Sequence, residues 1–404
     1  METRCYNAVW EHDTESITLY GTCQNPHPLR LVLAETLRMN ENKIRIIAST
    51  IGGAFGLKMH GHPEEPLICL MTKLIRRPVK WVENREECLL IGAREQQHKV
   101  EMAFDSDGNM TGLRDHFLAN IGAPSACPGW GMAFLTGLTM PGPYKVENID
   151  VHMNAVTTNK PSWNAARGYG KESTAIALEL AMDNAARQFG ISPIDLRLRN
   201  FITKEQFPYP SPTGLVYDSG DYGGVLLKAL ETIGYEDWKD KQKTALADGR
   251  HIGIGMAFEL TPEGGTIPGT MVAGYDSSSV RVGPDGTVRV LTGITSPGTH
   301  NGTAIAQIVA DELGIDMDRI EVLQGDTNSS PYGFGNYSGR STIVGGGSAA
   351  LAAKDVRDKI NAVAAALLEV EIDTLSLSEG IFSSSDNGDT TLTFAEVCYA
   401  SYTR

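Results

Sequence analysis

Two spacings of hydrophobic residues alternate along the first half of the chain. Apolar residues at every second position in short runs predict strands, and apolar residues at every third or fourth position in longer runs predict helices. The runs with strand spacing are residues 16–22, 42–49, 78–85, 98–105, 112–120 and 149–158. The runs with helix spacing are residues 29–39, 63–75 and 173–190.

The second half repeats this mixture after FPYPSPTGLVYDSGDYGG, in which Pro, Gly and Ser break every periodicity. Helix spacing returns at 225–238, 303–315, 349–370 and 391–404, and strand spacing at 252–260, 277–294 and 320–326. The turn sequences DSDGN and GPDGT are typical of hairpins, so the sheets should be partly antiparallel. We predict an α+β fold with mixed sheets and packed helices. Its expected parts are a first domain at 1–203, a linker at 204–222 and a second domain at 223–404, incomplete at its C-terminal end.

Composition and charge narrow the class of partner. With 404 residues and 41% hydrophobic content, the chain can bury one or two sizeable cores. A net charge of −14 argues against nucleic acid or an anionic membrane as the main partner, which leaves small molecules and proteins. The six cysteines show neither a CxxC pair nor a zinc spacing, so we expect reduced thiols and no iron–sulfur cluster. No signal-peptide pattern and no membrane-length apolar run are present, so we predict a cytoplasmic protein with no membrane span.

The stretch IIASTIGGAFGLKMH, residues 46–60, runs from a β-branched segment into a glycine turn. A strand that ends in glycines lets the backbone approach a ligand and can aim N–H groups at an anion or oxo group. The spacing matches neither GxGxxG nor GxxxxGK[ST], so a dinucleotide fold and a P-loop have little support. A tight turn between strand and helix is the alternative.

Three further glycine loops extend this picture. NAARGYGKES, residues 164–173, places an arginine and a tyrosine before a helix, which suits a fixed cation and a stacking ring; a surface turn is the alternative. SPGTHNGTAIAQ, residues 296–307, opens a helix whose N-terminus favours phosphate, or it is an ordinary capped helix. Residues 325–348 form a loop too long and glycine-rich for a simple hairpin. Together the loops predict an extended cofactor with oxo and phosphate groups.

In this order, the loops resemble the molybdenum-binding portion of the xanthine dehydrogenase/aldehyde oxidase family, the molybdenum hydroxylases. METRCYNAVWEH resembles the family's M-E-x-R-x-x-x-A-x-W start, GGAFGLK its G-G-x-F-G-x-K loop, and ARGYGKE its R-G-x-G loop. DLRLRNFI resembles the close of the first molybdenum domain, and AQIVADELGI with GDTNSSPYGFGNYSGRST resembles the core of the second. The resemblance covers essentially the whole chain and implies two molybdopterin-binding domains.

The resemblance also implies roles for single residues. It assigns Gln24, and the backbone of Phe55, to an oxo ligand of the metal, and it places Arg167 beside the cofactor and Tyr169 against flat substrates. The remaining cofactor-binding residues that it implies are Gly53, Ala54, Gly56, Gly298, Thr299, His300, Thr303, Ser338, Gly339, Arg340, Ser341 and Thr342. A plain surface histidine is the alternative for His300.

Two departures from the family concern the substrate. Purine-oxidising members carry a glutamate where this chain has Met59 and an arginine where it has Leu135. Losing both polar anchors should lower purine discrimination by orders of magnitude, so we do not expect xanthine as the substrate. With Tyr169 these residues imply a mostly apolar substrate pocket. Carbon-monoxide-oxidising members hold copper with a cysteine that residues 164–173 lack, which favours a hydroxylase.

A third departure concerns the general base. The family uses a glutamate in a G-x-G-E segment, and nothing before Arg404 matches it, so we predict no catalytic residue within this chain. The family's N-terminal hammerhead-like domain is not matched either. These observations suggest a split-gene subunit, a fragment or a gene-model truncation.

The implied function is that of the molybdenum-binding subunit of an oxidoreductase that hydroxylates an aldehyde or N-heterocyclic carbon with water. The implied cofactors are molybdenum with molybdopterin in its cytosine dinucleotide form, and [2Fe–2S] and FAD on partner subunits. A second molybdenum subunit is a further expected partner. The alternatives are a non-catalytic or truncated molybdopterin-binding scaffold and a carbon monoxide dehydrogenase relative. A nicotinamide dehydrogenase lacks a Rossmann fingerprint to support it.

Overall fold

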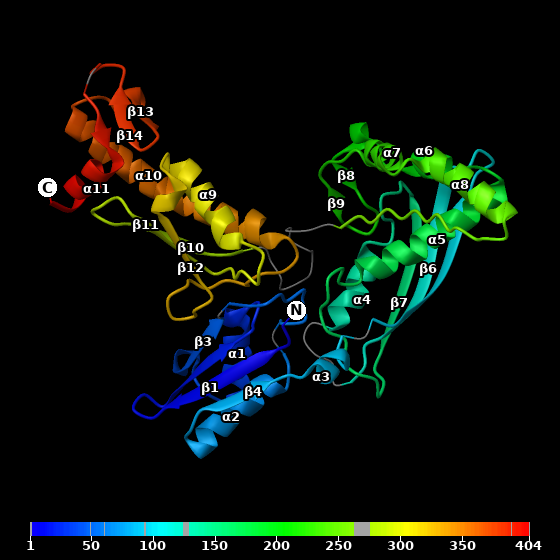
Figure 1. The fold of residues 1–404 in the computed structure, drawn as a ribbon, viewed down its shortest axis with the longest axis horizontal. Coiled ribbons are helices and arrows are strands. Elements are labelled where there is room, and N and C mark those ends of the chain that lie inside the picture. The colour runs from blue at the N-terminus through cyan, green and yellow to red at the C-terminus, as the bar shows by residue number, and fades with distance from the viewer. Residues whose placement is uncertain are drawn as a thin grey trace. The chain divides into compact units, whose positions relative to one another are not determined.

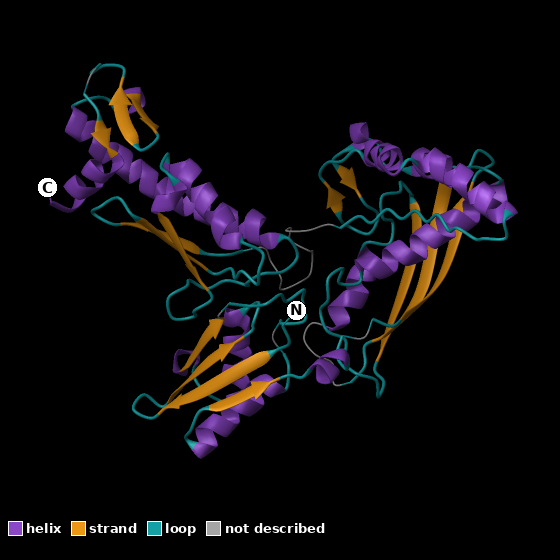
Figure 2. Cartoon of the chain, viewed as in Figure 1, coloured by secondary structure: helices purple, strands orange, loops and turns teal. Residues whose placement is uncertain are grey.

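The computed structural model describes residues 2–48, 50–59, 61–92, 94–123, 129–261, 275–388 and 390–403. The chain forms two compact units (Figure 1): residues 1–90 with 263–404 make the first, and residues 91–262 make the second. Each unit combines helices with sheets (Figure 2). None of the helices in the described ranges has both the length and the apolar character needed to cross a bilayer.

A four-stranded sheet with three helices opens the first unit. Its strands, in the order β3-β2-β1-β4, are β1 (Cys5–Glu11), β2 (Ser16–Gly21), β3 (Ile44–Ala48) and β4 (Val79–Val82). β1 pairs antiparallel with β2 and β4, whereas β2 pairs parallel with β3. The helices are α1 (Pro26–Leu37), α2 (Glu64–Ile75) and the short α3 (Arg85–Leu89), with a 3₁₀ turn at Glu41–Lys43. Inward residues such as Tyr6, Ile17, Leu19, Leu33 and Ile46 form their core.

The C-terminal part of the first unit has its own sheet of β10 (Ser278–Val282), β11 (Val288–Thr292) and β12 (Ile320–Gln324). β10 and β11 form the antiparallel hairpin predicted from GPDGT, and β12 joins β11 in parallel. The connection from β11 to β12 contains α9 (Asn301–Leu313) and a 3₁₀ turn at Met317–Arg319. The long helix α10 (Gly346–Leu368) packs against α9 and β10.

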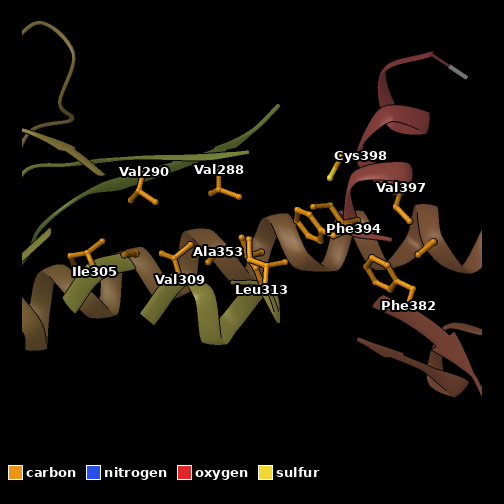
Figure 3. Close-up of a cluster of buried hydrophobic side chains, with 14 of the residues drawn as sticks. Val288, Val290, Ile305, Val309, Leu313, Ala353, Phe382, Phe394, Val397 and Cys398 are labelled. Carbon is orange, nitrogen blue, oxygen red and sulfur yellow. The ribbon is translucent and has the colours of Figure 1, made fainter. Parts of the chain in front are cut away.

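The chain closes with a small sheet of β13 (Leu375–Ser378), β14 (Ile381–Ser384) and β15 (Leu392–Thr393), preceded by a 3₁₀ turn at Ile372–Thr374 and followed by α11 (Phe394–Thr403). Figure 3 shows one apolar cluster that connects these elements. Val288 and Val290 of β11 lie over α9, while side chains of β14 and α11 extend the cluster along α10. The helix predicted at 391–404 is present as α11, but it begins only at Phe394, because Leu392 and Thr393 form β15; Phe394, Val397 and Cys398 anchor it.

Backbone contacts join the two sequence segments of the first unit. The N–H of Ala48 donates to the carbonyl of Gly325 (2.8 Å), and the N–H of Thr327 donates to the carbonyl of Ile46 (3.0 Å). A Cβ added at Gly325 would lie 2.7 Å from the Ala48 carbonyl oxygen, so only glycine permits this approach. The loop after β12 therefore lies directly beside β3.

The second unit is built on the sheet of β5 (Gln96–Phe104), β6 (Met110–Asn120) and β7 (Asn148–Val156). β5 and β6 are antiparallel, and β6 and β7 are parallel. α5 (Lys171–Phe189) contacts β5, and α4 (Gly129–Leu138) contacts β7 (Figure 1). Further elements are α6 (Pro193–Asn200), a 3₁₀ turn at Lys204–Gln206, the pair β8 (Tyr209–Pro210) and β9 (Val216–Tyr217), α7 (Tyr222–Ile233) and α8 (Tyr235–Ala247). The domain division at 203 and 223 stays a prediction.

The structure differs from the sequence prediction in several elements, of which three follow. The single helix expected at 225–238 is two helices, because Gly234 ends α7 in the left-handed conformation (φ 67°). The strand expected at 252–260 is wrong: this segment is irregular, and Met256, Phe258 and Leu260 pack on the core of the second unit. α4 was not predicted, because its nearly uninterrupted apolar sequence gives no helical periodicity.

Candidate functional site

Gln24 fastens three separate segments of the first unit together. Its side-chain Oε1 accepts the backbone N–H groups of Gly56 (2.9 Å) and Lys58 (3.3 Å), and its Nε2 donates to the carbonyl of Asn336 (2.7 Å). Its own carbonyl accepts the N–H of Asn336 (3.0 Å) and the hydroxyl of Thr295 (2.6 Å). The side chain is 3% exposed, so the amide is held in one orientation.

This orientation leaves one donor of Gln24 available. An amide nitrogen carries two hydrogens, and only one is used on Asn336. No acceptor for the second hydrogen occurs among the residues that the structure describes. Gln24 can therefore donate to an oxygen atom from outside the chain.

The glycine loop beside Gln24 is built from left-handed residues. Gly53 (φ 88°), Phe55 (φ 56°) and Gly56 (φ 95°) all have positive φ. A phenylalanine in this region is unusual and costs on the order of 1 kcal/mol or more. The Phe55 side chain is 49% exposed, and its backbone N–H has no acceptor within the described ranges. The loop thus offers a backbone donor one residue from the N–H that binds Gln24.

The lysine of this loop serves the structure. Lys58 is buried, and its Nζ lies 2.9 Å from Oε2 of Glu2, which also accepts the N–H of Gly52 (2.7 Å). Burial alone would raise the pKa of Glu2, but the hydrogen bonds from Lys58 and Gly52 outweigh it and lower that pKa. Met59, next along the chain, is partly buried and donates its N–H to the Gly56 carbonyl (3.2 Å).

The loop before α9 lies close to Gln24 through shared partners. Nδ2 of Asn336 donates to the hydroxyl of Thr299 (2.9 Å), and Nδ2 of Asn301 donates to the Thr295 carbonyl (2.8 Å). His300 occupies the N-cap in the left-handed conformation (φ 54°) and makes no capping hydrogen bond. The N–H groups of Asn301 and Thr303 have acceptors in the Ser296 hydroxyl and the His300 carbonyl, so among the described residues the N-terminus of α9 keeps the N–H of Gly302 and the positive end of its dipole. Gly298, Thr299, His300 and Thr303 are exposed here.

Arg340 is committed to its own chain. Its Nη1 donates to Oδ2 of Asp276 (2.7 Å) and to the Gly335 carbonyl (3.0 Å), and its Nη2 donates to the Tyr275 carbonyl (2.6 Å). Its guanidinium also lies 5.2 Å from the ring of Tyr337. Burial raises the pKa of Asp276, and Arg340 opposes that rise. This pair holds the glycine-rich loop in shape, and Asp276 adjoins no motif that would have revealed it in the sequence.

The end of that loop contains a buried hydroxyl with no partner. Ser338 (φ 51°) and Gly339 (φ 64°) are left-handed, and Ser341 begins a π-helical turn at Ser341–Gly345 that leads into α10. Ser341 is 6% exposed, and its Oγ has no hydrogen-bond partner in the structure as described. An unsatisfied buried hydroxyl costs about 1–3 kcal/mol, so this position fits a polar atom supplied by a bound group.

In the second unit, Leu135, Arg167 and Tyr169 lie on two adjoining elements. The loop Gly168 (φ 107°), Tyr169 (φ 52°) and Gly170 (φ 94°) is left-handed throughout. A Cβ added at Gly170 would lie 2.1 Å from the Met132 carbonyl oxygen, so the loop rests directly on α4. Leu135, 7% exposed, is on the same helix.

Tyr169 and Arg167 differ in their surroundings. A Cβ added at Gly131 of α4 would lie 2.7 Å from the Tyr169 hydroxyl, so the ring packs closely on this helix. Arg167 is exposed, and no residue of the described ranges pairs with its guanidinium. Its charge is therefore available to an anionic or polar group.

The structure brings together part of the predicted set within each unit. In the first unit, the Phe55 loop is hydrogen-bonded to Gln24 through the N–H of Gly56, and Asn336 connects Gln24 to Thr299. Sequence reasoning missed Asn336 and Thr295, although each stands inside or beside a predicted glycine loop. Their role depends on hydrogen bonds across the chain, which local spacing does not encode.

Comparison with known proteins identifies the family. Residues 1–201 and residues 228–404 each match a family model described as a molybdopterin cofactor-binding domain. The nicotine 6-hydroxylase large subunit of Paenarthrobacter nicotinovorans is 32% identical over 100% of this chain and 50% of its own length. The chain belongs to the xanthine dehydrogenase/aldehyde oxidase family. The predicted family and the α+β class with two molybdopterin-binding domains are confirmed.

Other members of the family show the same extent of similarity. The carbon monoxide dehydrogenase large chain of Afipia carboxidovorans is 35% identical, covering 96% of this chain and 50% of its own. The crystal structure of quinoline 2-oxidoreductase from Pseudomonas putida 86 superposes with a TM-score of 0.93 at 34% identity, covering 100% of this chain and 52% of that one. The chain thus spans about half the length of the curated relatives it matches.

Proposed function

We propose that this chain is the molybdopterin-binding part of an oxidoreductase that hydroxylates an aldehyde or an N-heterocyclic carbon with oxygen from water. The observation that carries the proposal is the set of side-chain hydrogen bonds from Gln24 to Gly56, Lys58 and Asn336, which we call the clamp at Gln24. It fixes an amide with one available hydrogen beside the Phe55 loop. The matches of both halves to molybdopterin cofactor-binding models support it.

The residues of the first unit fit the proposed cofactor. Gln24 and the backbone of Phe55, flanked by Gly53, Ala54 and Gly56, would donate hydrogen bonds to the oxygen side of the bound molybdenum. When bound, molybdenum with its pterin supplies the redox chemistry, while the protein holds and orients it. The unpartnered hydroxyl of Ser341 suits a polar group of the pterin.

The other loops would hold the rest of the cofactor. Ser338, Gly339 and Thr342 would line the pterin beside Ser341, with Arg340 fixing their loop through Asp276. Gly298, Thr299, His300 and Thr303 surround the α9 N-terminus, where a phosphate of the cytosine dinucleotide form would be favoured. In the second unit, Arg167 would contribute a cation toward the cofactor.

We propose an apolar substrate, with Met59, Leu135 and Tyr169 as its specificity residues. Met59 and Leu135 carry no charge that could anchor a purine, and Tyr169 offers a ring face for a flat molecule. The names of two relatives, nicotine 6-hydroxylase and quinoline 2-oxidoreductase, refer to N-heterocyclic compounds, which supports this substrate class.

The general base and the electron path are proposed to lie outside these residues. Residues 1–404 contain no G-x-G-E segment, so a glutamate elsewhere in the complex would act as the base. Electrons would leave through an iron–sulfur subunit and an FAD subunit, with a second molybdenum subunit as a further partner. We propose a cytoplasmic location for this complex.

A second candidate is carbon monoxide oxidation. The 35% identity to a carbon monoxide dehydrogenase large chain favours it. The absence of a cysteine from residues 164–173, where that activity requires one for copper, speaks against it. Copper analysis of the purified complex distinguishes the two.

The experiment is to purify the chain with its co-expressed genomic neighbours. Molybdenum and copper are measured by mass spectrometry, and dye reduction is tested with aldehydes, quinoline, nicotinate, xanthine and carbon monoxide. We expect molybdenum without copper and activity on an aldehyde or N-heterocycle. Metal-free protein that reduces no dye would contradict the catalytic proposal and leave the scaffold alternative.

A further inference from the structure

A histidine–aspartate pair with a fully buried carboxylate lies on the covered face of the second unit's sheet. Nδ1 of His98 on β5 is 2.8 Å from Oδ2 of Asp115 on β6, and the His98 ring stacks on Phe117 at 4.9 Å. Asp115 is fully buried, and its Oδ1 has no partner among the described residues. Such a pair, placed among apolar neighbours, requires an explanation beyond packing.

A chain of hydrogen bonds leads from this pair to the Tyr169 loop. Nε2 of His98 contacts Oε1 of Gln96 (2.8 Å), and Nε2 of Gln96 donates to the hydroxyl of Thr136 on α4 (2.9 Å). That hydroxyl donates its single hydrogen to the carbonyl of Gly170 (2.9 Å) or of Met132 (3.0 Å). Thr136 follows Leu135, and Gly170 follows Tyr169, so the chain ends between two specificity residues of the proposed function.

The direction of these bonds depends on the proton of His98. Both ring nitrogens face an oxygen, Asp115 Oδ2 and Gln96 Oε1, and a ring that carries both hydrogens would donate to both of them. A charged His98 donates to Gln96, Gln96 donates to Thr136, and Thr136 is left free to donate to Gly170. Each hydrogen bond from His98 to Thr136 is then satisfied, and the Thr136 hydrogen can go to the Gly170 carbonyl.

A neutral His98 reverses the chain. Nδ1 keeps its hydrogen for Asp115, and Nε2 becomes an acceptor, which the Gln96 amide can meet only by turning its NH₂ group toward the ring. Oε1 of Gln96 then faces Thr136 and takes the hydroxyl hydrogen. Because a hydroxyl has one hydrogen, the Gly170 carbonyl loses its bond from Thr136.

We propose that His98, supported by Asp115, is a positioning residue that sets the attachment of the Tyr169 loop to α4 through Gln96 and Thr136. We call the hydrogen-bond chain from His98 through Gln96 and Thr136 to Gly170 the relay. The effect of the relay on substrate binding rests on the proposed function, whereas the relay itself does not. The loop is held by the hydroxyl when His98 is charged and is loosened when His98 is neutral.

The charged groups near His98 are few. α4 carries no titratable residue within Gly129–Leu138, and Arg114 and His116 of β6 point to the opposite, exposed face of the sheet. α5, which contacts β5, contributes Lys171, Arg187 and three paired carboxylates: Glu172 with Arg94, and Glu179 and Asp183 with Arg197. Asp115 is therefore the charge in direct contact with the ring.

The test measures the loop itself. Histidine NMR on the full chain, with His98→Gln for assignment, follows the His98 ring between about pH 5 and 9. Amide hydrogen exchange, corrected for the intrinsic rate, follows the N–H groups of Tyr169 and Lys171, which bond within the loop. We expect protection to fall about fivefold as His98 loses its proton, the effect of one hydrogen bond.

Variants distinguish the relay from simple destabilisation. Thr136→Val removes the hydroxyl and should abolish the pH dependence, whereas Thr136→Ser keeps the hydroxyl and should retain it. His98→Gln should also abolish it, while His116→Gln, which removes a histidine from the exposed face, should leave it unchanged. If Thr136→Val proves unstable, His98→Gln, which should lose the pH dependence of loop protection, is compared with Thr136→Ser, which should retain it.

A His98 ring that does not titrate in this range would overturn the proposal. So would a Thr136→Val or His98→Gln protein whose loop protection changes with pH as in the wild type. Because exchange reports on the backbone of this chain, protein without molybdenum answers the question equally well. Failure of the relay and failure of the proposed function are thus separate results.

Discussion

At the scale of single residues, Gln24 does more than face a ligand. Its side chain accepts hydrogen bonds from the backbone N–H groups of Gly56 and Lys58 and donates one to the carbonyl of Asn336. A residue with this many partners affects both the fold and the proposed cofactor site, so a variant must be compared with one of similar chemistry elsewhere.

Replacing Gln24 by leucine should remove these partners and leave buried N–H groups unpaired. We expect the free energy of unfolding of the first unit to fall by roughly 2–4 kcal/mol, together with loss of molybdenum. Denaturant unfolding and metal analysis measure the two effects. Gln307→Leu, at an exposed position on α9, is the matched control and should stay within about 0.5 kcal/mol of wild type. Full molybdenum content in Gln24→Leu would contradict the role of Gln24.

The buried pair of Asp276 and Arg340 is a second residue-scale test. Asp276→Asn leaves the Arg340 guanidinium buried without its carboxylate, and we expect a loss of about 3–5 kcal/mol in unfolding free energy. The exposed pair of Arg289 and Glu321 provides the comparison, since Glu321→Gln should cost about 0–1 kcal/mol. Equal effects of the two substitutions on thermal unfolding would show that the buried pair does not hold its loop.

At the scale of elements, the Tyr169 loop and α4 are joined at backbone distance. Gly170 permits this contact because it has no Cβ and because its φ of 94° suits glycine. The close approach of the two backbones at this point therefore requires a residue without a side chain.

Gly170→Ala and Gly190→Ala separate backbone conformation from close contact. Both positions have positive φ, but a Cβ at Gly190 meets nothing within 4 Å, whereas a Cβ at Gly170 would meet the Met132 carbonyl. We expect Gly190→Ala to cost about 1 kcal/mol and Gly170→Ala to cost several times more, since α4 or the loop must move. Chemical denaturation of both variants measures these losses of unfolding free energy. Equal losses would mean that α4 or the loop can shift to accommodate the added Cβ at little cost.

The elements also show what local sequence can and cannot predict. Amphipathic helices such as α2, α9 and α10 follow from their spacing, and the glycine loops follow because positions such as Gly53 and Gly56 require positive φ. α4 was missed because it is apolar on nearly all sides. The partners Asp276 and Arg340 are 64 residues apart, and no local pattern encodes that pairing.

At the scale of the whole molecule, one buried acid should shape the pH dependence of stability. Glu65 is fully buried on α2, where its carboxylate accepts the Tyr6 hydroxyl (2.9 Å) and the N–H groups of Gly61 (2.9 Å) and His62 (3.1 Å). Burial raises the pKa of Glu65 to about 7, although these hydrogen bonds oppose the rise.

Because the folded-state pKa is raised, the folded protein binds this proton more tightly than the unfolded chain does. Glu65 therefore contributes stability that is full below the ordinary carboxyl range and is lost as the pH rises toward about 7. We expect the free energy of unfolding of Glu65→Gln, relative to that of the wild type, to rise by up to about 3 kcal/mol from pH 5 to pH 8, as measured by denaturant unfolding. Glu64→Gln, at the partly exposed neighbouring acid, controls for the lost charge. A difference between Glu65→Gln and wild type that does not change with pH would refute this.

The order in which the chain is synthesised gives the discontinuous first unit a further consequence. The second unit is continuous from 91 to 262, so it can fold while the ribosome is still making the rest. Gln24, however, must wait for Asn336, which is 312 residues further along the chain. The clamp at Gln24 closes only after residue 336 has been made, so we expect nascent chains that end before it to hold a folded second unit but no closed clamp. Insertion of the cofactor would then follow the synthesis of residue 336.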